Sequence, residues 1–330
     1  MNVLEYGAKG DGVTDDTLSV QSAINNAKNG TVYLPMGIYL VTSLIIDYST
    51  HLIGEGWSDI GHGGSIIKSK SALPIISIKK PTQRNTYYGA VLNDFSIIGN
   101  LQDNNGNNKQ SGINVDKEGS TIFERISISN CGDYAIRLAE TTHVSCLKIK
   151  NCILTKNAKG GIYGRCRGNA QINAITINDN IIGTNGYGIN VTGNNLNIRR
   201  NTIQNNNCSG ICLSNNDCSF SGGAKNVIID GNYFEGNKEG EILVESDLSG
   251  TVFNFHNNIE ILNNYFNTDL NKITKEDILA SITVLSNCNW KIRYFHLRNS
   301  NNFRLRNGAV AFSGIDTLDE TSIIESPFNI

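Results

Sequence analysis

The sequence predicts an all-β fold, a three-sided parallel β-helix, on the basis of three observations. The chain of 330 residues contains 47 asparagines and 33 glycines but only four prolines, a composition that disfavours long helices. Short segments that alternate apolar and polar residues recur at steps of 21 to 32 residues, and a second set of such segments runs in phase with the first. Each repeat is too short to bury its own apolar face, so successive coils must stack and share one core.

The first set of repeats ends in asparagine or cysteine. Its segments include FSIIGN, ISISNC and ITINDN, and their last residues are Asn100, Cys131, Cys152, Asn180, Asn201, Asn232 and Asn264. An asparagine at the end of each strand fits a ladder in which each side-chain amide satisfies the backbone of the turn at a neighbouring level. We expect these residues, including Cys131 and Cys152, to form one column along the solenoid.

The second set of repeats is centred on isoleucine, in segments such as YAIRL and YGINV. The central residues are Ile113, Ile136, Ile162, Ile189, Ile211 and Ile242. Alternation predicts strands in which these isoleucines point inward, while the residues one before, three before and one after them point outward. The column one before is mostly glycine and alanine, which predicts a shallow trough on this face of the solenoid.

A short helix is expected to close the N-terminal end of the solenoid. The amphipathic stretch TLSVQSAINNA follows Asp15 and Asp16, which are typical of an N-cap and a first helical turn. A terminal helix would hide the strand edges of the first coil. We therefore interpret the two aspartates as structural residues rather than as a catalytic pair.

The repeats divide one domain, residues 1–330, into three parts. Residues 1–50 are expected to form the cap and the first strands, and residues 51–310 the stacked coils. Residues 311–330 are expected to form a tail that folds back over the far end.

The segments GAKGDGVTDDT at 7–17 and TVYLPMGIYLV at 31–41 resemble the N-terminal signature of the pectate-lyase-like superfamily of right-handed parallel β-helices. This superfamily includes polygalacturonase-like hydrolases and phage tailspike depolymerases. The resemblance is close over residues 2–45, and the coil pattern agrees with it to about residue 310. It implies a right-handed solenoid, an enzyme that cleaves an extended polysaccharide, and a location outside the cell or on a virion surface. The sequence lacks the paired aspartates and the Arg-Ile-Lys tripeptide of the polygalacturonases, so we assign no catalytic family.

Charge and hydropathy argue against several other classes of protein. Lys and Arg total 28 and Asp and Glu total 30, so the net charge of −2 predicts no basic surface for nucleic acid. No apolar run approaches the roughly 18 residues that a membrane span requires, and the N-terminus lacks the pattern of a secretory signal peptide. The predicted partner is a polysaccharide, with no nucleic acid and no membrane, and the likeness to tailspikes would allow a homotrimer.

The outward columns predict where a glycan would bind. Tyr163 offers an aromatic face for a pyranose ring, and Asn190 offers an amide for hydroxyl groups. Arg165 is among the arginines that a lyase would have available as a base. Acidic side chains that follow the later strands would line the same face. The predicted substrate-binding residues are Arg137, Tyr163, Arg165, Asn190, Glu245 and Asp247.

Three acids near the C-terminal end of this face are the predicted catalytic groups. Glu239 and Glu241 lie two apart on one strand, which separates their backbones by about 6.5–7 Å. Aligning Ile278 with Ile242 would place Asp277 beside Glu241 in the next coil, although Ile282 offers an alternative alignment. Glycosidases use two carboxylates, about 5–5.5 Å apart for retention or 6.5–9.5 Å for inversion, and crowding would raise the pKa of one of them.

These residues favour a glycoside hydrolase slightly over a polysaccharide lyase. The alternative from another class is a non-catalytic glycan-binding spike or adhesin. No cofactor is predicted, and Ca²⁺ enters only if the protein is a lyase. Cys208 and Cys212 are weak metal-ligand candidates, and we expect the eight cysteines to be buried, reduced thiols.

Overall fold

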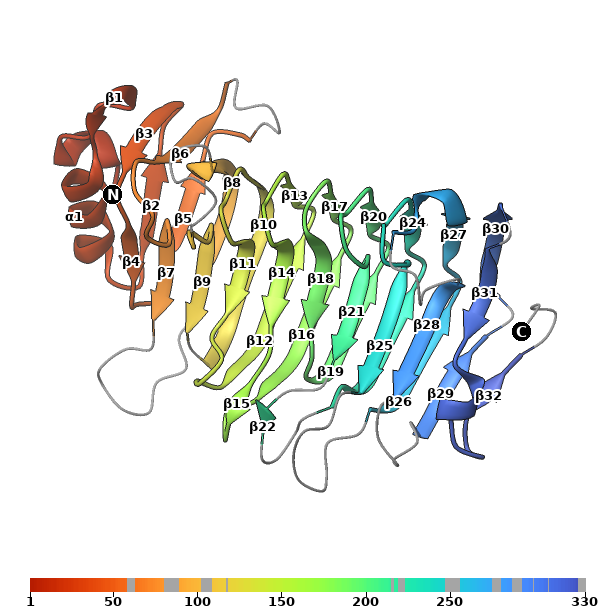
Figure 1. Ribbon diagram of the computed structural model, residues 1–330. Coiled ribbons are helices and arrows are strands. Elements are labelled where there is room, and N and C mark those ends of the chain that lie inside the picture. The colour runs from red at the N-terminus through yellow and green to blue at the C-terminus, as the bar shows by residue number, and fades with distance from the viewer. Residues whose placement is uncertain are drawn as a thin grey trace.

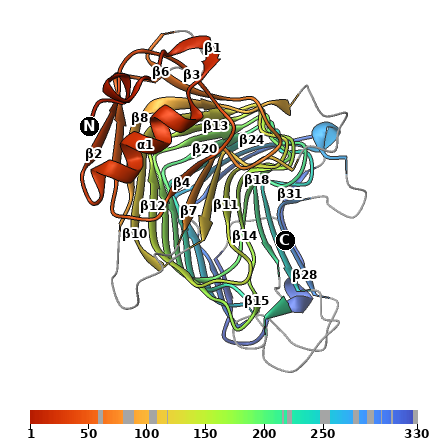
Figure 2. The same ribbon diagram turned by 90° about the vertical axis from the view of Figure 1, so that its left-hand side faces the viewer.

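The structure is a computed structural model, and it confirms a right-handed parallel β-helix with an N-terminal capping helix (Figure 1). It describes residues 1–57, 63–79, 89–101, 109–116, 118–214, 217–218, 223–246, 256–274, 280–286, 293–298, 300–307 and 309–325. The pairings between consecutive coils are parallel, so each strand lies beside its counterpart one coil later. Viewed along its axis, the solenoid has three sides around a common core (Figure 2).

The first two sides belong to one sheet of 20 strands, because β8 and β10 are long enough to pair on both sides. The first side consists of β2 (Thr31–Leu34), β5 (His51–Gly54), β8 (Val91–Ile98), β10 (Glu118–Ser129), β12 (Val144–Lys150), β16 (Ile172–Asn178), β19 (Asn194–Arg199), β23 (Lys225–Asp230), β26 (Asn257–Leu262), β29 (Arg293–Leu297) and β32 (Ile323–Ile324). The second side adds β1 (Asp11–Asp15), β3 (Gly37–Val41), β6 (Ser65–Ser69), β13 (Ile153–Thr155), β17 (Ile181–Gly183), β20 (Thr202–Gln204), β24 (Tyr233–Glu235), β27 (Tyr265–Asp269) and β30 (Asn302–Arg306).

The third side is a separate sheet of ten strands, which faces the viewer in Figure 1. Its strands are β4 (Leu44–Ile46), β7 (Ile76–Lys79), β9 (Ile113–Asp116), β11 (Tyr134–Leu138), β14 (Gly160–Gly164), β18 (Tyr187–Val191), β21 (Ile211–Ser214), β25 (Ile242–Ser246), β28 (Ala280–Ser286) and β31 (Val310–Ser313). A small pair, β15 (Arg167–Gly168) with β22 (Asp217–Cys218), joins two of the connections that follow this side.

The predicted isoleucine ladder is confirmed on the third side. The six central isoleucines pair in register from Ile113 to Ile242, and all of them are fully buried. The column continues through Ile282 to Phe312. Each inward side chain therefore packs on its neighbours above and below, and the coils share one apolar core.

Two asparagine ladders run along the solenoid where the sequence predicted one. The first contains Cys152, Asn180, Asn201, Asn232, Asn264 and Asn301, and the second contains Cys131, Asn157, Asn185, Asn206 and Asn237. Each Oδ1 accepts the backbone N–H of the preceding coil's ladder residue at 2.8–3.1 Å. The prediction that Cys131 and Cys152 share a column is wrong, because Ser129 pairs with Thr155 and sets Cys131 level with Asn157.

A left-handed residue precedes each ladder position from Cys131 to Asn264 and makes the corner tight. The φ angles lie between +53° and +66° at Asn151, Asp179, Arg200, Gly231 and Asn263 in one ladder, and at Asn130, Lys156, Thr184, Asn205 and Gly236 in the other. Asparagine and glycine tolerate this conformation better than other residues. The composition therefore reflects the corners of the solenoid, and the buried amides that follow satisfy the backbone there.

The N-terminal cap is α1 (Thr17–Ala27), which covers the open end of the first coils (Figure 2). Its inward face is buried at Val20 and Ile24. The fully buried Asp16 accepts hydrogen bonds from the backbone N–H groups of Lys9 and Gly10, and it makes no side-chain bond to the first turn of the helix. Asp16 is thus structural, because its hydrogen bonds stabilise the preceding segment at Lys9 and Gly10. None of the described helices is long and apolar enough to cross a membrane.

The prediction of a folded-back C-terminal tail is wrong for the residues that the structure describes. The chain continues the solenoid instead, because β31 adds to the third side in parallel and β32 adds to the first side in parallel. A short 3₁₀-helix, η4 (Ile315–Thr317), connects the two strands. The end of the core is covered by Leu318, which is 6% exposed.

Candidate functional site

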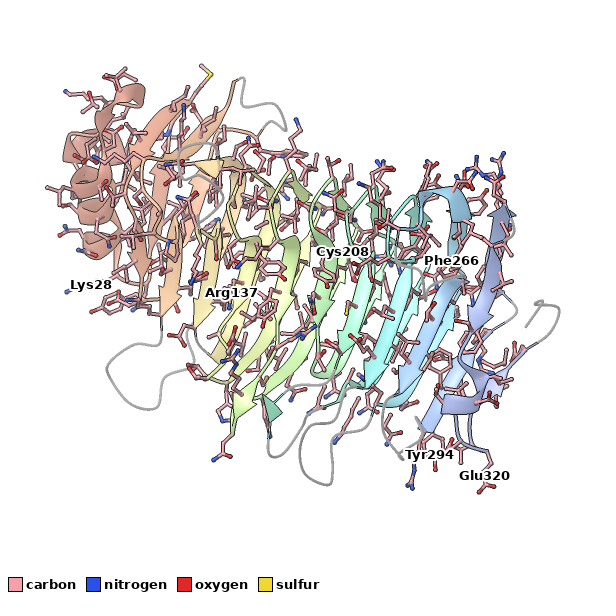
Figure 3. All side chains as sticks on the ribbon, viewed as in Figure 1. Lys28, Arg137, Cys208, Phe266, Tyr294 and Glu320 are labelled. Carbon is pink, nitrogen blue, oxygen red and sulfur yellow. The ribbon has the colours of Figure 1, made fainter. Side chains whose placement is uncertain are left out.

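The outer face of the third side brings three predicted substrate-binding residues together. Arg137, Tyr163 and Asn190 lie in register on β11, β14 and β18, and Arg137 is labelled over this sheet in Figure 3. They belong to a column that we call the outer row: Ile45, Ser77, Asn114, Arg137, Tyr163, Asn190, Cys212, Leu243, Thr283 and Ser313. Neighbouring members are about 4.8 Å apart, the spacing of paired strands.

Arg137 connects the charged groups of this face. The centre of its guanidinium lies 4.5 Å from the ring centroid of Tyr163, a cation–π contact. Its Nη1 donates to Asp133 Oδ2 at 3.0 Å, and its Nη2 donates to Glu140. Asp133 is almost completely buried and also pairs with Lys159 Nζ at 2.9 Å. These contacts fix the guanidinium against the aromatic ring.

Glu140 holds a second arginine next to the first, a role that the sequence did not reveal. Its Oε2 lies 2.9 Å from Arg167 Nε, while its other oxygen accepts from Arg137. The backbone N–H of Arg167 also donates to the Glu140 carbonyl at 2.6 Å. The only sequence signal was the position of Glu140 two residues after a strand that carries Arg137, and many surface acids share such a position.

Arg165 lies beside Asn190, and its Nε donates to Asn190 Oδ1 at 3.2 Å. The cations of this cluster are Arg137, Lys159, Arg165 and Arg167, and its anions are Asp133 and Glu140. The cluster therefore carries two excess positive charges on a chain whose net charge is −2. Such a local excess attracts anionic ligands.

Two tyrosines pack together at the centre of the cluster. The rings of Tyr134 and Tyr163 have centroids 4.8 Å apart. Gly160 allows this approach, because a Cβ at that position would lie 2.4 Å from the Tyr134 ring. Burial raises the pKa of Tyr163 against the lowering effect of the two nearby arginines. Tyr163 is therefore protonated at neutral pH.

The prediction that Glu241 faces outward is wrong. Its side chain is 1% exposed and lies at the end of the second asparagine ladder, where Asn237 Nδ2 donates to its carboxyl group. Thr268 Oγ1 lies 3.4 Å from the other carboxyl oxygen. Burial raises the pKa of Glu241 to about 8. This acid belongs to the core and does not reach a ligand on the outer face.

The same error of orientation applies to the predicted trough. A Cβ at Gly188 would lie 3.0 Å from Ile203 and 3.1 Å from the Asn206 amide, so this column faces the interior. In β11, β14 and β18 the strand begins two residues before the isoleucine, yet the residue directly before the isoleucine is buried as well. The alternation of buried and exposed side chains that a strand predicts is therefore not followed at this position.

The remaining predicted acids do not gather around Tyr163. The alignment of Ile278 with Ile242 is wrong, because Ile242 pairs with Ile282. Asp277 and Asp247 lie outside the described residues. Glu239 is part-exposed on the coil of β25, and Glu245 is three coils from the level of Arg165, or about 14 Å away.

The described residues contain no group of three His, Cys, Asp or Glu side chains that could hold a metal ion. The prediction that the cysteines are buried holds for Cys131, Cys152, Cys166 and Cys212, and it is wrong for Cys146, which is exposed, and for Cys208, which is part-exposed.

Comparison with known families agrees with this architecture. The family described as rhamnogalacturonase A/epimerase, pectate lyase-like, matches residues 1–223, and the chain belongs to this family.

Similar curated proteins act on polysaccharides according to their names. Alginate lyase 7 of Azotobacter vinelandii is 29% identical over 208 residues, which cover 58% of this chain and 23% of that protein. The capsule K30/K69-specific depolymerase 1 of Klebsiella phage K5-2 is 39% identical over 72 residues, covering 22% of this chain and 9% of the relative. The chain thus spans less than a quarter of the length of these relatives.

Solved structures share the fold at low sequence identity. The Agl-KA catalytic domain has a TM-score of 0.65 at 16% identity, with 94% of this chain and 55% of that chain covered. The A-module of the mannuronan C-5 epimerase AlgE4 of Azotobacter vinelandii has a TM-score of 0.59 at 17% identity, with 98% of this chain and 100% of that chain covered. These likenesses establish the parallel β-helix.

Proposed function

We propose that the protein binds an acidic polysaccharide across the third side and cleaves it at the cluster around Tyr163. The observation that carries this proposal is the excess of two positive charges around a half-buried tyrosine on the outer face. The aromatic ring of Tyr163 and the guanidinium groups together match a sugar that bears both hydroxyl and carboxylate groups, and Asn190, which is 3% exposed, positions Arg165 through its amide oxygen. The family and the alginate lyase relative support a polysaccharide substrate.

Elimination fits this cluster better than hydrolysis. A glycoside hydrolase needs one carboxyl group that donates a proton and another that activates water or attacks. The oxygens of Asp133 and Glu140 already accept hydrogen bonds from Arg137, and each carboxylate pairs with a second cation. The preference for a hydrolase depended on the cluster of Glu239, Glu241 and Asp277, of which Glu241 is inside the core.

The arginines and Tyr163 can supply two requirements of elimination. The carbon beside a uronate carboxylate loses its proton to a solvent water, and the electron pair forms a double bond as the bond to the glycosidic oxygen breaks. That oxygen leaves with a proton from the protein, and solvent then returns a proton to the donor. A guanidinium that neutralises the carboxylate stabilises the charge that develops in the first step, and we assign this role to Arg165. Tyr163, which is protonated at neutral pH, is the donor to the leaving oxygen.

Incubation with a panel of acidic and neutral polysaccharides tests the proposal. Elimination produces unsaturated sugar ends that absorb in the ultraviolet, whereas hydrolysis produces reducing ends without that absorbance. We expect the absorbance with an acidic polymer and none with a neutral one. Binding to the acidic polymer without any new chain ends would instead identify a non-catalytic glycan-binding protein, the alternative from another class.

Two substitutions separate the assigned roles. Tyr163→Phe should lower kcat at least about 100-fold, the typical contribution of a proton donor, with a small effect on binding. Arg165→Gln should weaken binding of the acidic polymer and lower kcat. Tyr233→Phe and Arg200→Gln, on the second side and at a corner, remove the same groups elsewhere and should leave activity unchanged. Equal activity of Tyr163→Phe and the unmodified protein would refute the assignment.

Assembly is a separate proposal. A homotrimer would place three such faces on one particle, and light scattering at several protein concentrations would give the mass directly. A monomer mass throughout would rule the trimer out.

A further inference from the structure

The side-chain exposure of the outer row decreases abruptly along the solenoid. Toward the N-terminus its members are partly or largely exposed at Ile45, Ser77 and Asn114. From Asn190 toward the C-terminus the members Asn190, Cys212, Leu243 and Thr283 are only 3%, 1%, 2% and 1% exposed, although they point away from the core. Outward side chains reach such burial only when another part of the chain covers them.

The covered residues and the side chains that cover them form a second apolar cluster, which is distinct from the core. Cys212 and Leu243 form its centre, and Tyr187, Ile273 and Leu285 pack against them. Tyr187 and Leu285 come from β18 and β28 of the sheet itself. Ile273 comes from the connection between β27 and β28, so the described part of this connection, residues 270–274, lies against the outer face at Ile273. We call these five residues the apolar wall.

The length of one connection explains why the wall forms at this level. Only three residues separate β17 from β18, whereas ten separate β27 from β28. The longer connection contains η3 (Leu270–Lys272), which stands out beyond the profile of the other coils in Figure 2. Asp269 accepts the N–H of Asn271, and the N–H of Thr274 donates to the Lys238 carbonyl at 2.7 Å. The first bond closes the local turn, and the second ties the described part of the connection to the preceding coil.

The wall begins close to the proposed reaction centre. Cys212 is two coils beyond Tyr163, which is about 10 Å along the axis. This distance leaves room for about a disaccharide beside the part-exposed Arg165, which is bonded to the buried Asn190. In the other direction the row remains open over Arg137, Asn114 and the coils before them.

We propose that the apolar wall closes the binding face on its C-terminal side and that the protein therefore binds a polysaccharide at one end of the polymer chain. This inference rests on the proposed function, because it assumes that the acidic glycan lies along the outer row. A chain end binds beside Arg165 against the wall, and the remainder of the polymer extends toward the N-terminal cap. Cleavage at Tyr163 then releases short products of about disaccharide size.

Binding stoichiometry tests the closed end without requiring catalysis. Calorimetry uses the complete protein with two preparations of one acidic polymer that differ twofold in mean length, compared at equal mass concentration. End binding predicts that the number of sites per unit mass is halved for the longer preparation. An unchanged number of sites per unit mass would show internal binding and would overturn the inference, while the proposed function would stand.

Product analysis gives an independent test when the protein is active. Release of short products from the first time point, with little loss of viscosity, supports action at chain ends. A ladder of intermediate lengths with a rapid fall in viscosity contradicts it. The absence of any cleavage refutes the proposed enzymatic function alone, since the stoichiometry still reports where the polymer binds.

A substitution in the apolar wall tests whether the wall is the cause of end binding. Ile273→Asp places a charge in the apolar cluster and should detach the connection, so that the number of sites per unit mass approaches independence from polymer length. Ile181→Asp is the control, because Ile181 is 43% exposed on the second side and lies outside the wall. Retention of length-dependent stoichiometry by a folded Ile273→Asp variant would show that the wall does not close the face.

Discussion

Replacement of Glu241 by glutamine should remove a pH-dependent loss of stability from the folded protein. Glu241 is 1% exposed and is surrounded by the Asn237 amide and the Thr268 hydroxyl, without a cation among its described contacts. Burial without a compensating charge raises its pKa from 4.5 to about 8. The folded state therefore keeps the proton over a range in which the unfolded chain has released it.

The sign and size of the effect follow from that difference. The stabilisation by the protonated acid is complete below pH 4.5 and is lost as the pH rises toward 8. Each pKa unit corresponds to about 1.4 kcal/mol, so the loss across this window is on the order of 5 kcal/mol. Glutamine keeps a neutral acceptor for Asn237 and has no proton to release, so Glu241→Gln should be several kcal/mol more stable than the unmodified protein at pH 8.

Urea unfolding at pH 4.5, 6 and 8 measures the effect. His256 acts in the opposite direction, because burial lowers its pKa to about 4 and its contribution to stability is lost on acidification. Because both proteins contain His256, its contribution cancels in the difference between their free energies of unfolding at each pH. Glu245→Gln, on the outer face of the same strand, is the matched control and should not change the pH profile. Parallel profiles for Glu241→Gln and the unmodified protein would refute the reasoning.

Three further predictions concern the ladder, the aromatic pair and the cysteines. Asn206→Ala should lower the free energy of unfolding by about 2–4 kcal/mol, because it leaves buried backbone groups without partners. Asn207→Ala, at an exposed position, should lower it by less than about 0.5 kcal/mol, and an equal loss for the two variants would contradict the ladder. Gly160→Ala should displace the Tyr134 ring, detected as a change in near-ultraviolet circular dichroism, while an unchanged spectrum would argue against the close approach. A thiol reagent at pH 8 should label Cys146 far faster than Cys152, whose pKa burial raises to about 12, and mass spectrometry of the digest would show equal labelling if this account is wrong.

The sequence predicted the solenoid because its strongest constraint is periodic. The isoleucine column repeats in register in every coil from Ile113 to Ile242, and stacking requires that repeat. The second asparagine ladder was also visible, since Asn157, Asn185, Asn206 and Asn237 each follow a first-ladder residue by five positions. It was missed because the two ladders were merged through Cys131.

The functional face was harder to predict because orientation at corners does not follow strand alternation. Glu241 was placed outside by extending the period of two one residue too far, and the structure places it in the core. Arg137, Tyr163 and Asn190 lie within the strands, where the period holds, and their column was predicted correctly. The contribution of Glu140 depends on two arginines from different coils, and a single sequence does not reveal such a contact.

A crystal structure of the complex with an acidic oligosaccharide tests the central claim most directly. The account predicts density for the sugar over β11, β14 and β18, with a carboxylate within hydrogen-bonding distance of Arg165 and the Tyr163 hydroxyl beside a glycosidic oxygen. Density on the first or second side, with the cluster around Tyr163 unoccupied at saturating ligand, would contradict it.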